Sequence, residues 1–191
     1  KPSFNTIGAS GKNAVILHYI DLQDKIKDGD MILLDLGALS NNYASDITRT
    51  YPANGKFTQR QKEIYDIVLE AQEVTMDAMH VGALETDVND AVKAFYVKSL
   101  KAINLIRDDS EVDKYYYHGV GHPLGLDVHD VARRDRIMQE NNVYTVEPGL
   151  YIKEEGIGIR IEDDVWVTKN GVVNLSKDII KTTNDIENFM K

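Results

Sequence analysis

Four carboxylates stand in or directly after apolar, strand-like segments, where an ionised side chain is expensive to bury. Asp35 interrupts the run MILLDL, and Asp46 follows eleven residues later in SDITRT. Glu147 comes between YTV and a Pro-Gly pair. In GIRIE, strand alternation puts Arg160 and Glu162 together on the face away from the core. Carboxylates repeated at strand ends point to metal ligation or to general acid and base chemistry.

The first two carboxylates are predicted to be partners across a hairpin. The segments 31–36 and 43–51 read as strands that flank a turn at Ser40-Asn41-Asn42. In a tight hairpin centred on Ser40-Asn41, residues whose numbers add up to 81 face each other, so the β-carbons of Asp35 and Asp46 would lie about 5 Å apart. Two like charges at that distance favour protonation of one carboxylate, and a divalent cation between them removes the conflict.

Histidine offers a nitrogen ligand to add to these carboxylates. Three of the five histidines, His118, His122 and His129, fall within the glycine-rich segment HGVGHPLGLDVHD, which allows close approach to a site. One imidazole with four carboxylates carries a charge of about -4, which two divalent cations balance. Such oxygen-rich ligation suits manganese, iron(II) or cobalt. Two bridged ions would activate a water molecule and polarise a carbonyl group.

Taken one at a time, these residues also have structural explanations. Asp35 could bond main-chain N–H groups at a turn, and Glu162 could belong to a solvated acidic cluster in IEDD. His18 in NAVILHY could be a core histidine, and Arg160 could neutralise the nearby acids. The catalytic hypothesis therefore rests on the joint pattern, because several independent structural explanations would have to coincide.

The elements that would position these residues follow the order strands, two helices, strands. Thr58 and Gln61 form a capping box, after which apolar residues recur at helical spacing up to Gly82. A second amphipathic helix begins at Thr86. Short segments that read as strands follow at 144–146, 157–162 and 165–167. This order predicts an α+β fold, with an antiparallel sheet and flanking helices.

Composition limits the class of protein. With 191 residues and 42% hydrophobic content, we expect one domain with a substantial core. The chain has no cysteine, which excludes thiolate nucleophiles and cysteine-ligated metals and suits a reducing cytoplasm. The net charge of -9 disfavours nucleic acid, and the sequence offers neither a membrane span nor a signal peptide. We therefore expect a cytoplasmic protein without nucleic-acid or membrane partners.

Taken in order, these segments resemble the aminopeptidase P and prolidase family of metallopeptidases. The resemblance is carried by DLG, SDITRT, HGVGHPLGLDVHD, EPGLY and GIRIEDD, and it runs along essentially the whole chain. It implies the α+β pita-bread fold shared with creatinase and methionine aminopeptidase. Residues 1–191 would form the catalytic domain, partial at its amino terminus, with the family's separate amino-terminal domain lying outside this chain.

The resemblance also implies a role for each matching residue. Two divalent ions would be held by Asp35, Asp46, His122, Glu147 and Glu162. The catalytic residues would be Glu147, His129 and His118, and the substrate site would be formed by His18, Tyr151 and Arg160. Manganese is the usual metal of the family, with cobalt, iron(II) or zinc as alternatives. A proline-containing peptide would be the substrate, and the full-length protein would be a homo-oligomer.

Three functions stay open. An Xaa-Pro aminopeptidase, which removes the N-terminal residue that precedes proline from longer peptides, is favoured by the histidine segment and by SDITRTYPANGKFTQRQ. An Xaa-Pro dipeptidase, or prolidase, is the rival, because the short segment between Glu147 and Glu162 is typical of prolidase-like bacterial members. A metal-free pita-bread binding module is the third. Such modules lack part of the ligand set, whereas all five positions here hold residues able to ligate.

Overall fold

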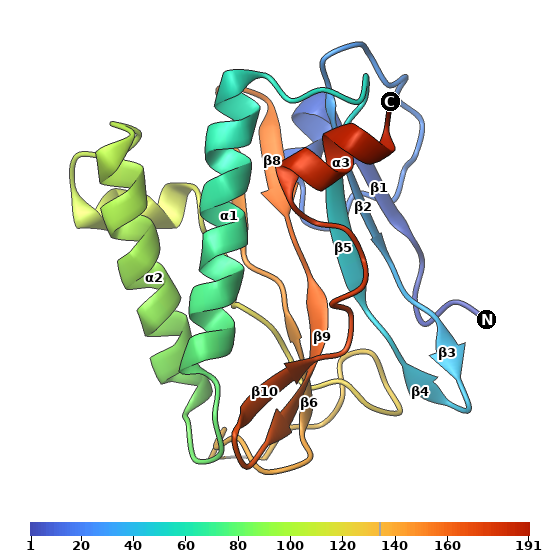
Figure 1. Ribbon diagram of the computed structural model, residues 1–191, viewed down its shortest axis with the longest axis vertical. Coiled ribbons are helices and arrows are strands. Elements are labelled where there is room, and N and C mark those ends of the chain that lie inside the picture. Colours follow the sequence, from blue (N-terminus) through green and yellow to red (C-terminus); the bar gives the residue numbers. More distant parts are fainter. Residues whose placement is uncertain (134) are drawn as a thin grey trace.

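Two long helices lie side by side along one flank of the molecule, and the strands occupy the other. The computed structural model describes residues 1–133 and 135–191. Helix α1 (Gln59–Ala78) stands between α2 (Glu85–Ala102) and the strands (Figure 1). Strands precede and follow this pair in the chain, which confirms the predicted order and the α+β class. A third helix, α3 (Thr183–Phe189), adds to the predicted elements.

The strands of the described chain pair antiparallel in four small sheets. Those before the helices are β1 (Ile7–Ser10), β2 (Met31–Leu36), β3 (Leu39–Ser40), β4 (Tyr43–Ala44) and β5 (Ile47–Pro52). Those after the helices are β6 (Val143–Val146), β7 (Gly149–Ile152), β8 (Ile157–Arg160), β9 (Asp163–Thr168) and β10 (Gly171–Asn174). The sheet orders are β1-β2-β5, β10-β9-β6, β3-β4 and β7-β8. Two 3₁₀ turns, η1 (Gly11–Val15) and η2 (Asp109–Lys114), complete the elements.

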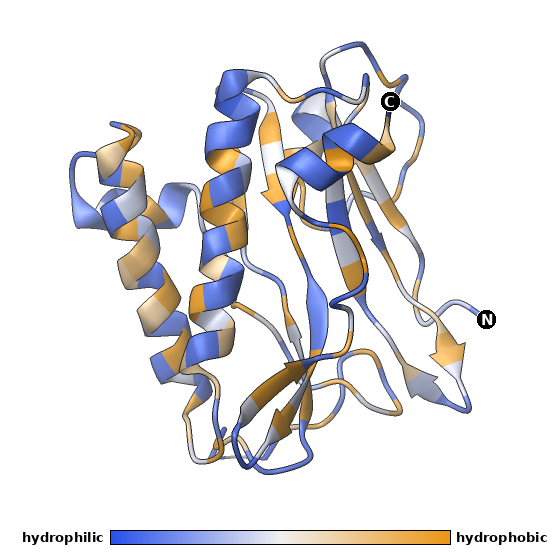
Figure 2. Cartoon of the chain, in the orientation of Figure 1, coloured by the Kyte–Doolittle hydropathy of each residue, from blue (hydrophilic) through white to orange (hydrophobic). Residues whose placement is uncertain are grey.

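Helix α1 begins as the capping box predicts. The Thr58 side chain accepts a hydrogen bond from the Gln61 N–H, and the Gln61 side chain accepts one from the Thr58 N–H. Its buried residues Ile64, Val68 and Ala71 belong to the main apolar core. Figure 2 shows hydrophilic and hydrophobic bands alternating along both long helices, as amphipathic helices require. Among the described residues, no helix combines the length and apolarity needed to cross a membrane.

The hairpin that carries the two aspartates differs in register from the prediction. Asp35 pairs with Thr48 rather than facing Asp46, and paired residues have numbers that add up to 83. The turn is centred on Asn41 and Asn42, whose φ angles of 50 and 66 are those of a type I′ turn. The centre thus lies one position later than predicted. Because each pairing moves by two residues, Asp35 and Asp46 stay on the same face.

The strand predicted over 43–51 is interrupted beside Asp46. Gly37 approaches the opposite strand so closely that a β-carbon there would lie 1.8 Å from the carbonyl oxygen of Ser45. The N–H of Asp46 leaves the ladder and donates to Oδ2 of Asp164 at 3.2 Å. Asp46 is therefore hydrogen-bonded to strand β9, which directly follows the predicted ligand Glu162.

Candidate metal centre

One cavity brings the predicted site residues together. It has a volume of about 260 Å³. All five predicted ligands line it: Asp35, Asp46, His122, Glu147 and Glu162. Four of the predicted catalytic and substrate residues line it as well: His18, His118, His129 and Arg160. We call this space the acidic cavity.

Three of the predicted ligands form its inner cluster. Asp46, His122 and Glu162 each offer a ligand atom, and these atoms lie within 4.8 Å of one another. Nε2 of His122 lies 3.5 Å from Oδ2 of Asp46 and 3.5 Å from Oε1 of Glu147. The carboxylate oxygens of Asp46 and Glu162, together with the imidazole nitrogen of His122, form a donor set for a divalent cation, and Glu147 can add a third oxygen.

Asp35 differs from these three residues because it pairs with the guanidinium group of Arg160. Its Oδ2 accepts a hydrogen bond from Nη2 of Arg160 at 2.7 Å, and both side chains are buried. Oδ1 of Asp35 and Oδ1 of Asp46 are buried without a hydrogen-bond partner in the described part of the chain. A buried carboxylate oxygen is normally paired, and these two are the kind of atoms that bound cations satisfy. The residues present therefore fit the metal ions that the resemblance implies.

Electrostatics within the acidic cavity reflect a surplus of negative charge. Burial raises the pKa of Asp35 to about 7, against the opposing effect of Arg160, and the charge of Asp46 adds to the rise. Burial likewise raises the pKa of Glu162 well above its ordinary value, with further contributions from Glu147 and Asp46. Divalent cations in the cavity would remove this conflict, because they stabilise the ionised carboxylates.

The pKa of His122 shifts in the opposite direction to the pKa values of His118 and His129. Burial lowers the pKa of His122, but hydrogen bonding to Asp46 and the charge of Glu147 outweigh burial, so the pKa is raised overall. Burial lowers the pKa of His118 to about 4. The pKa of His129 is also lowered, by burial and by the charge of His122. His118 and His129 are thus neutral imidazoles at pH 7. The single N–H of His118 is on Nδ1 and donates to the Gly119 carbonyl oxygen at 2.7 Å, so its Nε2 accepts from the Tyr151 hydroxyl.

Tyr151 does not line the cavity but connects two residues that do. Its hydroxyl lies 2.8 Å from Nε2 of His118 and accepts a hydrogen bond from Nη1 of Arg160 at 3.2 Å. His18 and His129 are exposed at the cavity rim, where the His129 ring centroid lies 4.1 Å from that of His122. Tyr151 therefore supports the wall, whereas the two exposed histidines can meet a ligand entering from solvent.

The comparisons with known proteins agree with this geometry. The model of metallopeptidase family M24 matches residues 1–169. The chain belongs to that family. The Xaa-Pro aminopeptidase of Escherichia coli (strain K12) is 43% identical over 210 residues, covering 99% of this M24 chain and 47% of that protein. The chain therefore spans about half the length of the curated relatives it matches.

Solved structures extend the match to three dimensions. A Bacillus anthracis structure assigned to aminopeptidase P has a TM-score of 0.96 at 53% identity, covering 100% of this M24 chain and 46% of that one. Escherichia coli aminopeptidase P with the inhibitor Pro-Leu has a TM-score of 0.93 at 43% identity, covering 99% and 47%. These likenesses confirm that the chain has the pita-bread fold.

Three polar residues of this M24 chain that the sequence analysis missed touch the predicted ligands. The hydroxyl of Thr48 donates to Oε2 of Glu162 at 2.5 Å, and that of Thr145 donates to Oε1 of Glu147 at 3.3 Å. Asp164 accepts from the N–H of Asp46, as described above. Each stands two positions from a ligand in sequence, so the period of a strand could have found all three.

One orientation expected from the sequence needs correction. Arg160 and Glu162 share a face, as predicted, but that face is not solvated: both side chains are buried in the wall of the acidic cavity. The physical reason is that β5 covers them. Oγ1 of Thr48 accepts a hydrogen bond from Nε of Arg160 at 3.1 Å in addition to donating to Glu162. The solvated acidic cluster considered for IEDD is therefore wrong.

Proposed function

We propose that the protein is an Xaa-Pro aminopeptidase that hydrolyses the peptide bond between an N-terminal residue and a following proline. The observation that carries the proposal is the acidic cavity, in which Asp46, His122 and Glu162 gather. The buried Oδ1 atoms of Asp35 and Asp46 in this cavity have no hydrogen-bond partner among the described residues. The Xaa-Pro aminopeptidase names of the relatives support this reading over prolidase. The retained ligand set argues against a metal-free binding module.

Two divalent ions would be held by Asp35, Asp46, His122, Glu147 and Glu162. We propose manganese as the metal, since the donors are carboxylate oxygens with one imidazole, which cobalt, iron(II) and zinc also accept. When bound, such ions supply a nucleophile at neutral pH and polarise the scissile carbonyl. Thr48 and Thr145 orient two of the ligands through their hydroxyl groups, which reduces the freedom of Glu162 and Glu147.

Glu147 is the proposed proton carrier. Its carboxylate faces the cavity, and burial raises its pKa, so it can take a proton from the attacking water and pass it to the leaving proline nitrogen. His129, as a neutral imidazole, is proposed to donate a hydrogen bond to the carbonyl oxygen as negative charge develops there. His118, whose N–H donates to the Gly119 carbonyl oxygen, is proposed to shape the wall that the substrate contacts. His18, at the rim, would contact the peptide, and Arg160 and Tyr151 would hold the wall in place.

The chemistry of the substrate fits an open, polar cavity. A peptide nitrogen of proline carries no hydrogen, so an enzyme that recognises an extended main chain loses a hydrogen bond there. A site that binds the free amino terminus and the carbonyl oxygen does not need that hydrogen bond. We further propose that residues 1–191 are the catalytic domain of a cytoplasmic homo-oligomer.

The test compares hydrolysis of Xaa-Pro-Yaa and Xaa-Pro peptides by the full-length protein with added Mn²⁺. We expect cleavage of the tripeptide between Xaa and proline and little cleavage of the dipeptide. Asp46→Asn is the control that removes a ligand oxygen with little change of shape. Preferred cleavage of the dipeptide would select prolidase instead, and no hydrolysis with any of the four metals would overturn the proposal.

A further inference from the structure

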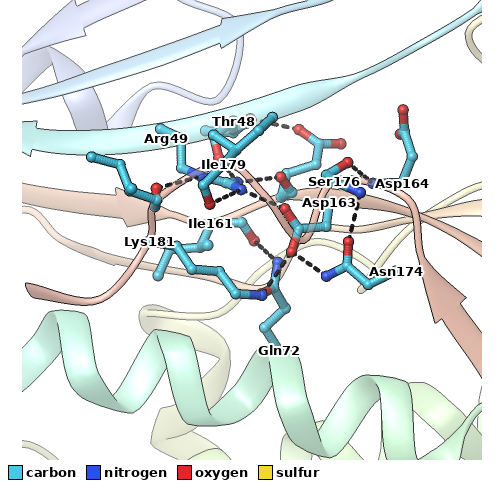
Figure 3. A network of polar contacts seen from close by, with 12 residues as sticks. Thr48, Arg49, Gln72, Ile161, Asp163, Asp164, Asn174, Ser176, Ile179 and Lys181 are labelled. Carbon is cyan, nitrogen blue, oxygen red and sulfur yellow. Dashed lines mark hydrogen bonds and ion pairs between the residues drawn. The ribbon is translucent and has the colours of Figure 1, made fainter. Parts of the chain in front are cut away.

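Behind the acidic cavity lies a second group of buried and half-buried polar side chains, which we call the buried ion-pair network (Figure 3). It consists of Arg49, Gln72, Asp163, Asn174 and Lys181. None of these residues lines the cavity. They come from β5, α1, β9, β10 and the segment before α3, and the network therefore joins elements that are distant in the sequence.

The glutamates of the cavity both lie in short links between strands. Glu147 falls between β6 and β7, and Glu162 falls between β8 and β9. The main chain of such a link lacks the regular ladder of a sheet, so its carbonyl groups need other donors. The positions of the two carboxylates therefore depend on the groups that hold these links.

One side chain holds both links. Nε2 of Gln72 donates to the carbonyl oxygen of Val146 at 3.3 Å and to that of Ile161 at 3.2 Å. These are the residues immediately before Glu147 and Glu162. Gln72 is fully buried on the strand-facing side of α1, where an amide is costly unless its hydrogen bonds are made. Both of its N–H groups are used in this bridge.

Lys181 fixes the orientation of that amide. Its Nζ donates to Oε1 of Gln72 at 2.6 Å and to Oδ2 of Asp163 at 2.7 Å. Because an ammonium group only donates, the amide oxygen must face Lys181 and the amide nitrogen must face the two carbonyl groups. Figure 3 shows Gln72 rising from the helix toward Ile161, with Lys181 beside it.

Arg49 secures the same link from the other side. Its Nη1 donates to the carbonyl oxygen of Glu162 at 2.5 Å, and its Nη2 bonds Oδ1 of Asp163 at 2.6 Å. Successive carbonyl groups of the β8–β9 link are thus bound by Gln72 and Arg49. The link between β6 and β7 shares the first of these donors.

We propose that Gln72, oriented by Lys181, is a positioning residue that sets the separation of Glu147 and Glu162 and thereby the affinity of the cavity for its metal ions. The inference rests on the proposed metal site. Helix α1, which contributes no predicted ligand, would then affect metal binding through the main-chain carbonyl groups of Val146 and Ile161.

The experiment is a calorimetric titration of the full-length, metal-free protein with Mn²⁺ alone, with thermal unfolding measured on each variant. Gln72→Met removes the donors at similar length, and we expect the apparent Kd for Mn²⁺ to rise about tenfold or more. Gln72→Glu keeps the shape and the contact with Lys181 but not the donors, and we expect a similar rise. Lys181→Met is expected to give a smaller one.

Thr75→Val is the matched control. Thr75 is buried in the same helix, and its hydroxyl donates only to the Ala71 carbonyl oxygen within that helix. We expect it to retain the Kd of the parent. A folded Gln72→Met variant with the parent Kd would overturn the inference, as would equal weakening by Thr75→Val.

The remaining outcomes also decide. If both Gln72 variants fail to fold, Lys181→Met, at a partly exposed position, takes their place, and an unchanged Kd in that variant overturns the inference. If the parent itself binds no Mn²⁺, the proposed function fails, and the positioning role fails with it. Loss of binding in the Gln72 variants, with the parent binding normally, supports both.

Discussion

The acidic cavity and the buried ion-pair network lie on opposite sides of the segment IEDD. They differ in whether their buried carboxylates have hydrogen-bond partners. Asp163 meets donors from Arg49, Lys181 and Asn174, so its charge is fully paired. Asp164 and Asp46 each keep a buried oxygen without a partner in the described residues. Asp163 and Asp164, neighbours in β9, thus differ in pairing, and the second contacts Asp46 of the acidic cavity.

Paired carboxylates of this kind stabilise the fold, whereas unpaired ones can bind a cation. A buried ion pair whose hydrogen bonds are all made is costly to break, because removing one partner leaves the other uncompensated. A buried group of carboxylates with too few cations is unfavourable as it stands and becomes favourable when cations bind. The comparison therefore predicts that substitutions on the two sides have opposite consequences.

The largest effect is expected in the buried ion-pair network. Asp163→Ala leaves the guanidinium of Arg49 buried without its carboxylate, which should lower the free energy of unfolding by about 3–5 kcal/mol. Urea unfolding of the metal-free protein, followed by far-ultraviolet circular dichroism, measures this change. A loss below about 1 kcal/mol would mean that Asp163 is no better paired than the cavity carboxylates.

In the acidic cavity, the same measurement should give a different result. Asp46→Asn removes one of several mutually repelling charges, so we expect the metal-free variant to be at least as stable as the parent. Mn²⁺ at about one hundred times its Kd should stabilise the parent by about 2.7 kcal/mol for each occupied site and stabilise the variant less. Comparison of the two unfolding curves with and without Mn²⁺ tests both statements. A variant that Mn²⁺ stabilises as strongly as the parent would contradict the comparison.

The smallest effect belongs to a site outside both regions. Thr58→Ala removes the side chain that caps α1 and should lower the free energy of unfolding by about 1 kcal/mol. Its affinity for Mn²⁺ should match that of the parent, because Thr58 contacts neither the cavity nor the links. If Thr58→Ala also raised the Kd for Mn²⁺, metal affinity would depend on the overall free energy of unfolding rather than on the buried ion-pair network.

Periodicity and local motifs were enough to predict which side chains line the acidic cavity, and the five ligands that the resemblance implies stay a prediction. Asp35 lies in β2, and Asp46, Glu147 and Glu162 lie directly beside strands, where alternation sets the face of a side chain. The alternation through Arg160 and Glu162 also gave the correct common face, although not its burial. The predicted register of the first hairpin is wrong because the turn is formed by Asn41 and Asn42, which accept the positive φ angles of a type I′ turn, and not by Ser40 and Asn41.

The buried ion-pair network could not be predicted in this way. Gln72 reads as one more polar residue within the apolar stripe of a helix, and Lys181 as a surface residue near the end of the chain. Their meeting, 109 positions apart, depends on how the helix and the final segment pack against the strands. No local period encodes that contact, so it becomes visible only in three dimensions.

The same contact has a consequence for the order of events during synthesis. The last predicted ligand is Glu162, but the ammonium that orients Gln72 belongs to Lys181, and Arg49 bonds the carbonyl groups of Ile179 and Ile180. A ribosome that has released only the predicted ligands has therefore not yet released Lys181, which orients Gln72. If Gln72 has the proposed positioning role, metal binding would follow the release of Lys181 and would depend on the ions present after synthesis.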